Sequence, residues 1–449
     1  MKSTFYILNL LKSKKSKKHI SFHMPGHKAS KKFKKFFPIS DYDITELSYS
    51  DDLQSPSGAI KKAQQSVAKI VGAANAFFLT DGSSSGVITL LYAAKKFGDK
   101  IIIFKNSHKS VYNACRILGL EPIILQGEEM DGMVFAPQVS AVERIFESQT
   151  GVAGVFATSP DYYGNVAPLK DYAEVCKKHG KLLLCDGAHG AHLVFGEDKI
   201  LHCGNYCNAW VDGAHKSLPT LTQGALLCVN DGKILFDIEE GLNIFRTTSP
   251  SYPIMASIEF GYKYLSENYN KVANVKGEIT GFKYRLSKFT IYPSTDWTKL
   301  VIDCKAMGIS PDKTQKYLEK NGIFAEMNDG RFLVFYLSAL TEKNQLIKLE
   351  KRLQKGYNKN KLKGDCYKLE NIPKTQRQQS YLSAINEESE YVLLAKAEGR
   401  IAAENFGVSP PCVPIVAAGE KITAEVIVFM QKSKNTFGVY GGKIKVVKI

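Results

Sequence analysis

Two short strings decide the fold: LLLCDGAH at residues 182–189 and AWVDGAHK at residues 209–216. Each contains an apolar run, typical of a buried strand, that ends in an aspartate. In parallel α/β sheets, ligand sites gather at the carboxyl ends of the strands. We therefore expect Asp186 and Lys216, which are thirty positions apart, to lie at the same edge of such a sheet.

An acid and an amine at neighbouring strand ends are the pair that pyridoxal phosphate (PLP) requires. The lysine forms a Schiff base with the aldehyde, and the acid keeps the ring nitrogen protonated so that the ring remains an electron sink. Lys216 and Asp186 fit these two roles. A helix cap and a solvated charge are the simpler interpretation of two such residues, so further motifs are needed to favour the cofactor.

Two upstream segments extend this pattern. The string TDGSSSG at residues 80–86 precedes an apolar, helix-compatible stretch, and a turn of this kind offers a phosphate free N–H groups and hydroxyls. Ser83, Ser84 and Ser85 supply the hydroxyls, although Gly-Ser turns also commonly cap helices. His108 follows another buried strand, where an imidazole either stacks on a flat ring or is an ordinary hydrogen-bonded residue.

The order of these elements resembles that of the fold type I PLP-dependent enzymes. Six separated strings narrow the resemblance to the ornithine/lysine/arginine (Orn/Lys/Arg) decarboxylase family, and they extend from about residue 20 to about residue 420. The strings are HMPGHK at 23–28, SHKS at 107–110, DGAHGAH at 186–192, HKSLP at 215–219, SPSYPIMAS at 249–257 and GRIAAE at 399–404.

The resemblance implies a fold type I large domain with a mainly parallel sheet and a smaller α+β C-terminal domain. It also implies roles for individual residues. Ser83–Ser85 would hold the phosphate and His108 would stack on the ring. His215 would contact the phosphate or protonate Cα, and Lys216 is an equal candidate for the proton transfer.

The resemblance further implies a homodimer or higher homo-oligomer with shared active sites. Thr248 or Ser249 would reach the partner's cofactor, although this segment also suits a helix cap. Ala188 and His189 would line the ring, but packing alone also explains them. The chain resembles the short form of the family, which lacks an N-terminal receiver-like domain.

Several positions depart from the family pattern. Gly213 stands where the family often has a serine, so one phosphate hydroxyl is missing, and Asp161 replaces a threonine in a loop that we interpret mainly as a turn. Near the C-terminus, Cys412 replaces a glycine and Ala418 a proline. We expect the C-terminal changes to affect substrate specificity.

A diamino substrate requires a carboxylate that binds its distal cation. Each candidate is more simply a surface acid or a cap when taken alone. The candidates are Asp51, Asp52, Glu326, Asp329 and Glu404.

The chain of 449 residues carries a formal charge of +16, and residues 12–37 contain ten lysines. A basic surface suggests an anionic partner. We expect a solvated face instead of a nucleic-acid site, because the run matches no nucleic-acid-binding motif. The N-terminus lacks the features of a secretory signal and no apolar stretch approaches membrane-spanning length, so we expect a cytoplasmic protein without membrane contact.

The nine cysteines are scattered, which favours buried free thiols in a reducing compartment. His202, Cys203 and Cys207 suggest zinc, but no second ligand pair with suitable spacing follows, and we predict no metal.

The sequence predicts an N-terminal helix and basic arm at 1–40, a large PLP-binding domain at 41–285 and a small C-terminal α+β domain at 286–449, with the family's C-terminal region at about 375–449. Strands and helices alternate through the large domain, as in a parallel sheet with crossover helices. We also predict a last helix over Ser389–Ala403.

The favoured hypothesis is a PLP-dependent decarboxylase of a basic amino acid, with arginine or lysine ahead of ornithine. One alternative is a PLP-dependent transaminase or lyase that acts on a non-basic amino acid, which the positive charge favours. A second is a degenerate, non-catalytic protein of the same fold that only binds.

Overall fold

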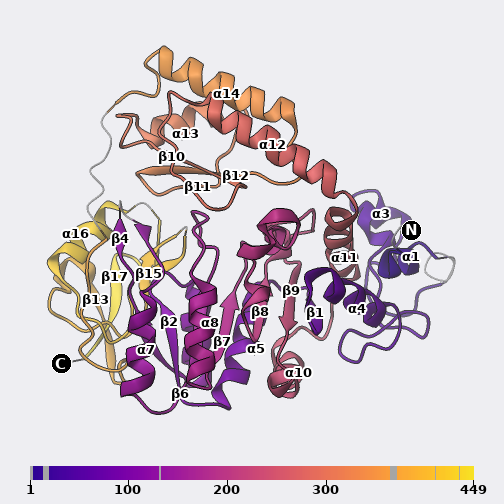
Figure 1. Cartoon of the computed structure of the whole chain (residues 1–449), viewed down its shortest axis with the longest axis horizontal. Helices are drawn as coiled ribbons and strands as arrows, with labels where there is room; N and C mark the ends of the chain where they lie inside the picture. The colour runs from indigo at the N-terminus through magenta and orange to yellow at the C-terminus, as the bar shows by residue number, and fades with distance from the viewer. Residues whose placement is uncertain are drawn as a thin grey trace. The chain divides into compact units, whose positions relative to one another are not determined.

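The computed structural model describes residues 4–13, 20–130, 133–364, 372–409, 411–433 and 435–448. Ser3 and residues 14–19 of the predicted N-terminal helix and arm lie outside these ranges, as do Cys366, one of the nine cysteines, and Pro410. The chain forms two compact units (Figure 1). The first comprises Met1–Ala93 and Leu183–Asn274, and the second comprises Ala94–Leu182 and Val275–Ile449.

The strands of a seven-stranded sheet are divided between the two units. The first unit holds four of them in the order β1 (Asn75–Leu79), β9 (Ala225–Val229), β8 (Ala209–Asp212) and β7 (Leu182–Asp186). β7 and β8 are parallel, whereas β9 is antiparallel to both β8 and β1. Every residue of β7, β8 and β9 is buried, which explains why these strands are continuous apolar runs in the sequence.

Helices accompany these strands in the chain. The longer helices of the first unit are α1 (Tyr6–Leu11), α4 (Ala59–Val71), α5 (Ser83–Lys95), α10 (Leu235–Phe245) and α11 (Tyr252–Glu267). Tyr6 and Ile7 at the start of α1 donate their backbone N–H groups to Glu259, a buried carboxylate on α11. α4 ends at Gly72, whose φ of +75° is left-handed and suits glycine.

The second unit holds the other three strands of the sheet, β6 (Val152–Thr158), β2 (Lys100–Phe104) and β3 (Glu121–Leu125), all parallel. Their helices are α6 (Lys109–Leu118), α7 (Val139–Ser148) and α8 (Leu169–Lys178). The expected mainly parallel sheet is therefore confirmed, with β9 as the antiparallel exception.

A second sheet of the same unit contains β10 (Lys299–Asp303), β12 (Phe332–Tyr336) and β11 (Met327–Asn328). Helices α12 (Tyr269–Arg285), α13 (Pro311–Glu319) and α14 (Lys343–Asn358) cover one face of it (Figure 1). Ile279, Leu300, Leu318 and Leu349, one from each of four elements, belong to the apolar cluster that joins helices and sheet.

The rest of the second unit is built from short elements. They are α15 (Tyr381–Asn386), β13 (Ser389–Leu393), β14 (Phe406–Val408), β15 (Val413–Val416), α16 (Ala424–Lys432), β16 (Thr436–Phe437) and β17 (Lys443–Val447). A buried ion pair connects this region to the end of β2, because Lys105 Nζ lies 2.7 Å from Glu420 Oε2.

The predicted helix over Ser389–Ala403 is wrong. Residues 389–393 form β13, which pairs with β17 so that Ser389 faces Val447 and Leu393 faces Lys443. The segment is rich in helix-forming Glu, Leu, Ala and Lys, but strand pairing and burial of Leu394 and Ala397 outweigh that propensity. Gly399, at φ +78°, then turns the chain.

Cys412, one of the departures from the family pattern, lies in a strained part of the backbone. Its φ of +60° lies in the left-handed region that favours glycine, and its carbonyl oxygen accepts a hydrogen bond from the N–H of Lys109 at 2.9 Å. A residue with a Cβ in this conformation costs about 1–2 kcal/mol. The strain therefore falls on the segment that contacts the start of α6.

We expect Cys412→Gly to raise the free energy of unfolding by about 0.5–1 kcal/mol, because relief of the strain exceeds the entropy that glycine adds to the unfolded chain. Urea unfolding of the two proteins measures the difference. Cys412→Ala is the matched control, since it removes the thiol and keeps the strain. Equal stability of the Gly and Ala variants would contradict the assignment.

Within the described part of the chain, no helix combines the length and apolar character needed to cross a membrane.

Candidate active site

Asp186 is the last residue of β7 and lies almost entirely inside the first unit, with 5% of its surface exposed. Its Oδ1 accepts a hydrogen bond from the N–H of Ala188 at 3.1 Å. Burial raises the pKa of this carboxyl, the charge of Lys216 lowers it in part, and Asp212 raises it further. A buried acid of this kind gains most from a cationic partner that enters the site.

Lys216 lies in α9 (Ala214–Ser217), the short helix directly after β8. Its Nζ is 3.1 Å from Nε2 of His189, which belongs to the turn after Asp186. The two strand ends therefore bring Asp186, His189 and Lys216 together in one unit. Ala188 is buried in the same turn.

His215 is held by the loop that precedes β9. Its backbone N–H and its Nδ1 both lie 3.0 Å from the carbonyl oxygen of Gly224. A carbonyl only accepts, so Nδ1 carries the proton and Nε2 retains a lone pair. Burial lowers the pKa of His215 and nearby Lys216 lowers it further, although the Gly224 carbonyl raises it. The lowered pKa favours the neutral ring, in which Nε2 is a hydrogen-bond acceptor.

The serine turn opens α5, where Ser83–Ser85 form the first helical turn. Gly82 precedes it with φ +86° and donates its N–H to the carbonyl of Gln223 at 2.9 Å. A Cβ on Gly86 would lie only 2.6 Å from a methyl of Val211, so the helix start packs directly on β8. The first-turn N–H groups of a helix have no intrahelical partner and suit an anion.

Asp81 connects the serine turn to the segment before α11. Its Oδ1 accepts a hydrogen bond from the hydroxyl of Ser85 at 2.7 Å, and its Oδ2 accepts one from the N–H of Thr247 at 3.1 Å. Thr248 and Ser249 follow directly. Asp81 belongs to the motif TDGSSSG, but neither it nor Gln223 was predicted from the sequence as a site residue.

His108 belongs to the second unit, where it is the N-cap of α6. Its Nδ1 lies 2.8 Å from the hydroxyl of Ser110 and accepts from the N–H of Ser110 at 3.2 Å. This contact fixes the orientation of the ring at the carboxyl end of β2. Its role as a stacking residue stays a prediction.

Several acids that were predicted as candidates for the distal cation instead bind groups within the protein. Asp51 caps α4 and accepts from the N–H groups of Gly58 and Ile60. Asp329 accepts from Tyr163 Oη, and Glu404 lies 3.9 Å from Arg116. Asp161 accepts from the N–H groups of Tyr163 and Asn165, which supports the interpretation of its loop as a turn.

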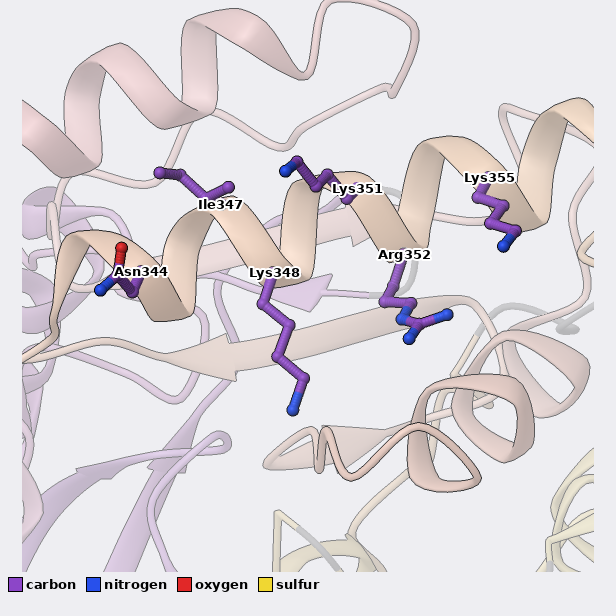
Figure 2. Close-up of a pocket in the computed structure, with 6 residues that line it drawn as sticks. All are labelled: Asn344, Ile347, Lys348, Lys351, Arg352 and Lys355. Atoms are coloured by element: carbon purple, nitrogen blue, oxygen red, sulfur yellow. The ribbon is translucent and has the colours of Figure 1, made fainter.

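The hollow beside α14 is chemically different from this site (Figure 2). Its lining contains four cationic side chains and no acid. The lining residues are Asn344, Ile347, Lys348, Lys351, Arg352 and Lys355. A hollow with this charge would repel a cationic amino acid, so it is not a substrate site of that kind.

Comparison with known proteins identifies the chain. Residues 6–303 match the model of the Orn/Lys/Arg decarboxylase major domain, and residues 360–442 match that of the Orn/Lys/Arg decarboxylase C-terminal domain. The chain belongs to the Orn/Lys/Arg decarboxylase family. As a member of this family it is an amino-acid decarboxylase, and the resemblance predicted from the six strings is confirmed.

Relatives in this family match nearly the whole chain. Protein YaaO of Bacillus subtilis (strain 168), described as uncharacterized, is 31% identical over 91% of this chain and 89% of its own length. An arginine decarboxylase of the same strain is 28% identical over 94% of this chain and 92% of its own. The lysine decarboxylase LdcF of Francisella novicida shares the fold at a TM-score of 0.83 and 19% identity, covering 99% of this chain and 81% of that one.

The residues of the first unit fit the PLP that this family implies. Asp186 is a buried acid for the ring nitrogen, Lys216 is an amine within 3.1 Å of His189, and the start of α5 supplies unpaired N–H groups for a phosphate. The donor set therefore includes one group for each charged part of the cofactor.

Gly213 shows why this decarboxylase departs from the family serine. A Cβ at this position would lie 2.5 Å from the carbonyl oxygen of Ala188, and a backbone atom cannot move aside cheaply. A serine here would push the turn that carries Asp186 and His189 away from α9. The missing hydroxyl follows from this close approach.

We expect Gly213→Ser to destabilise the protein by about 1–3 kcal/mol and to weaken PLP binding instead of restoring a phosphate contact. Denaturant unfolding and PLP titration measure the two effects. Gly277→Ser, where a Cβ meets nothing within 4 Å, is the matched control and should leave both unchanged. Tighter PLP binding by Gly213→Ser would show that the hydroxyl matters more than the contact.

Proposed function

We propose that this chain decarboxylates a basic amino acid with the help of PLP, and that arginine is the first substrate to test. The observation that carries the proposal is the buried carboxyl of Asp186 in the same turn as His189, whose Nε2 contacts Lys216. Relatives named arginine decarboxylase match over almost the full chain, which supports arginine ahead of lysine and ornithine.

Bound PLP supplies an electron sink for the bond that joins Cα to the carboxylate. Asp186 would keep the ring nitrogen protonated, because an ionised buried acid and a pyridinium neutralise each other. The Nζ of Lys216 would hold the cofactor through its aldehyde carbon. The N–H groups of Ser83–Ser85 would hold the phosphate, and His108 would stack on the ring.

A proton must then be delivered to Cα after carbon dioxide leaves. Two groups on the same short helix are candidates, Nζ of Lys216 and Nε2 of His215. His215 fits because Gly224 holds its Nδ1 and leaves Nε2 to take up and pass on a proton, although burial lowers its pKa and so favours the neutral ring. Lys216 fits because its Nζ contacts His189, which belongs to the turn after Asp186.

The contacts described above reduce the number of candidates for the acid that binds the distal cation of the substrate. Asp51, Asp52 and Asp329 each accept a backbone N–H group and Glu404 faces Arg116, which leaves Glu326. We propose Glu326 as the acid that sets specificity.

A screen of carbon dioxide release tests the proposed function. The PLP-loaded protein is incubated with arginine, lysine and ornithine alongside neutral and acidic amino acids. We expect release from arginine or lysine, with ornithine slower. Release only from neutral or acidic amino acids, or keto acid without carbon dioxide, would favour the transaminase or lyase alternative. Nucleic-acid binding without turnover would favour the non-catalytic alternative.

We also propose that the active enzyme is at least a dimer, in which the segment of Thr248 and Ser249 reaches the partner's cofactor. Light scattering of the PLP-loaded protein tests the assembly. A monomer with full activity would contradict it.

A further inference from the structure

A second cluster of reactive side chains lies behind the turn that carries Asp186. A ring nitrogen of His202, Sγ of Cys203 and a carboxylate oxygen of Asp212 all lie within 4.8 Å of one another, and all three residues are buried. Asp212 ends β8, and the other two follow the turn after β7. None of the three has a role in the proposed decarboxylation.

Some polar atoms of this cluster lack a hydrogen-bond partner among the described residues. Asp212 has no exposed surface, its Oδ2 accepts from Tyr262 Oη at 3.1 Å and lies 3.5 Å from Nε2 of His202, and His202 is 2% exposed. Among the described residues, neither Oδ1 of Asp212 nor Nε2 of His202 has a hydrogen-bond partner. Buried polar atoms normally have one, so a missing group is expected here.

Asp212 brings a negative charge to the cluster. Its carboxylate pairs with His202, whose Nε2 lies 3.5 Å from Oδ2. A buried carboxylate is costly without a counter-charge. A metal cation supplies that charge and takes up the unpaired atoms at the same time.

Additional sulfur ligands lie next to the cluster. The thiol of Cys185, on β7 beside Asp186, shares side-chain hydrogen bonds with the thiols of Cys203 and Cys207. Gly187 leaves room at this point, because a Cβ there would lie 2.9 Å from Sγ of Cys203 and 3.0 Å from Oδ1 of Asp212. Ligands from two strand ends and one loop therefore converge behind residue 187.

We propose that His202, Cys203 and Asp212, with Cys185 as the fourth ligand, form a buried structural site for a zinc-like divalent cation. Nitrogen, thiolate and carboxylate ligands are those that zinc takes in closed tetrahedral sites. The cation would join β7, β8 and the intervening loop, and so would fix the turn that carries Asp186. It is a support for the site and takes no part in the chemistry.

Coordination has one further geometric consequence. Nδ1 of His202 now accepts from the N–H of Gly204 at 3.2 Å, which places the ring proton on Nε2. Binding through Nε2 moves that proton to Nδ1, so the Gly204 amide must turn away. The thiols lose their protons, and binding therefore weakens at acid pH.

The test is the metal content of the full-length, PLP-loaded protein after growth with added zinc. We expect about one zinc per chain, and a near-complete loss in Cys203→Ala and His202→Gln. Cys304→Ala, which removes another buried thiol from the second unit, is the matched control and should keep the metal. Circular dichroism of each variant establishes that the chain is folded.

Cobalt provides a second readout that does not depend on activity. We expect the reduced wild-type protein to bind cobalt with a near-ultraviolet thiolate charge-transfer band, and Cys203→Ala to lack that band. A wild-type chain that contains no zinc and binds no cobalt would overturn the proposal. The same holds for a disulfide between Cys185 and Cys203 in the purified protein, or for zinc retained in both folded variants.

Discussion

Replacing Lys216 with alanine is expected to reduce decarboxylation by on the order of 10³-fold or more, because the variant loses both the amine that binds the cofactor covalently and a candidate proton donor. PLP should still bind, more weakly, through Asp186 and the serine turn. Activity assays with saturating PLP measure the loss. Absorbance near the visible edge reports whether the covalent link forms.

A matched control is Lys233→Ala, an exposed lysine that follows β9 in the same unit. It should retain full activity and the wild-type spectrum. Near-normal turnover in Lys216→Ala at saturating PLP would mean that another amine holds the cofactor, and the assignment of α9 as the site would fail.

Asp186→Asn is expected to have the second largest effect. The amide keeps the shape of the side chain but cannot hold the ring nitrogen protonated, so we expect kcat to fall by about 10²–10³-fold while KM changes far less. Steady-state kinetics separates the two parameters. Glu239→Gln, an exposed acid on α10, is the control. A rise in KM as large as the fall in kcat would indicate that Asp186 only maintains the fold.

The same substitution should alter how the stability of the cofactor-free protein depends on pH. Burial raises the pKa of Asp186 in the folded state, so its stabilising contribution is complete below the unfolded pKa and is lost as the pH rises through the folded pKa. Above about pH 4, wild-type stability should therefore decline relative to Asp186→Asn. Denaturant unfolding between pH 4 and 8 measures the difference, and parallel curves would contradict a raised pKa.

Much of this arrangement was accessible from the sequence because buried strands are continuous apolar runs. Asp186 ends one such run and Lys216 lies four residues after Asp212, which ends another, so the pattern predicted that both lie near strand ends. The serine turn was accessible for a similar reason, since glycine and hydroxyl residues before an apolar helix mark its start.

Other features depend on contacts between distant segments. The strand at residues 389–393 is specified by its pairing with β17, more than 50 residues later, and its own composition favours a helix. Gln223 contacts the serine turn through its backbone carbonyl, which no side-chain motif reveals. The cluster behind Gly187 combines Cys185, Cys203 and Asp212, whose irregular spacing matches no metal motif.

The most direct test of the account is borohydride reduction of the PLP-treated protein followed by peptide mass spectrometry, because reduction makes a bond between lysine and the aldehyde permanent. We predict a single pyridoxyl phosphate adduct on Lys216, which should be absent from Lys216→Ala. An adduct on a different lysine, or no adduct at saturating PLP, would contradict the pairing of Asp186 with Lys216 around one cofactor ring.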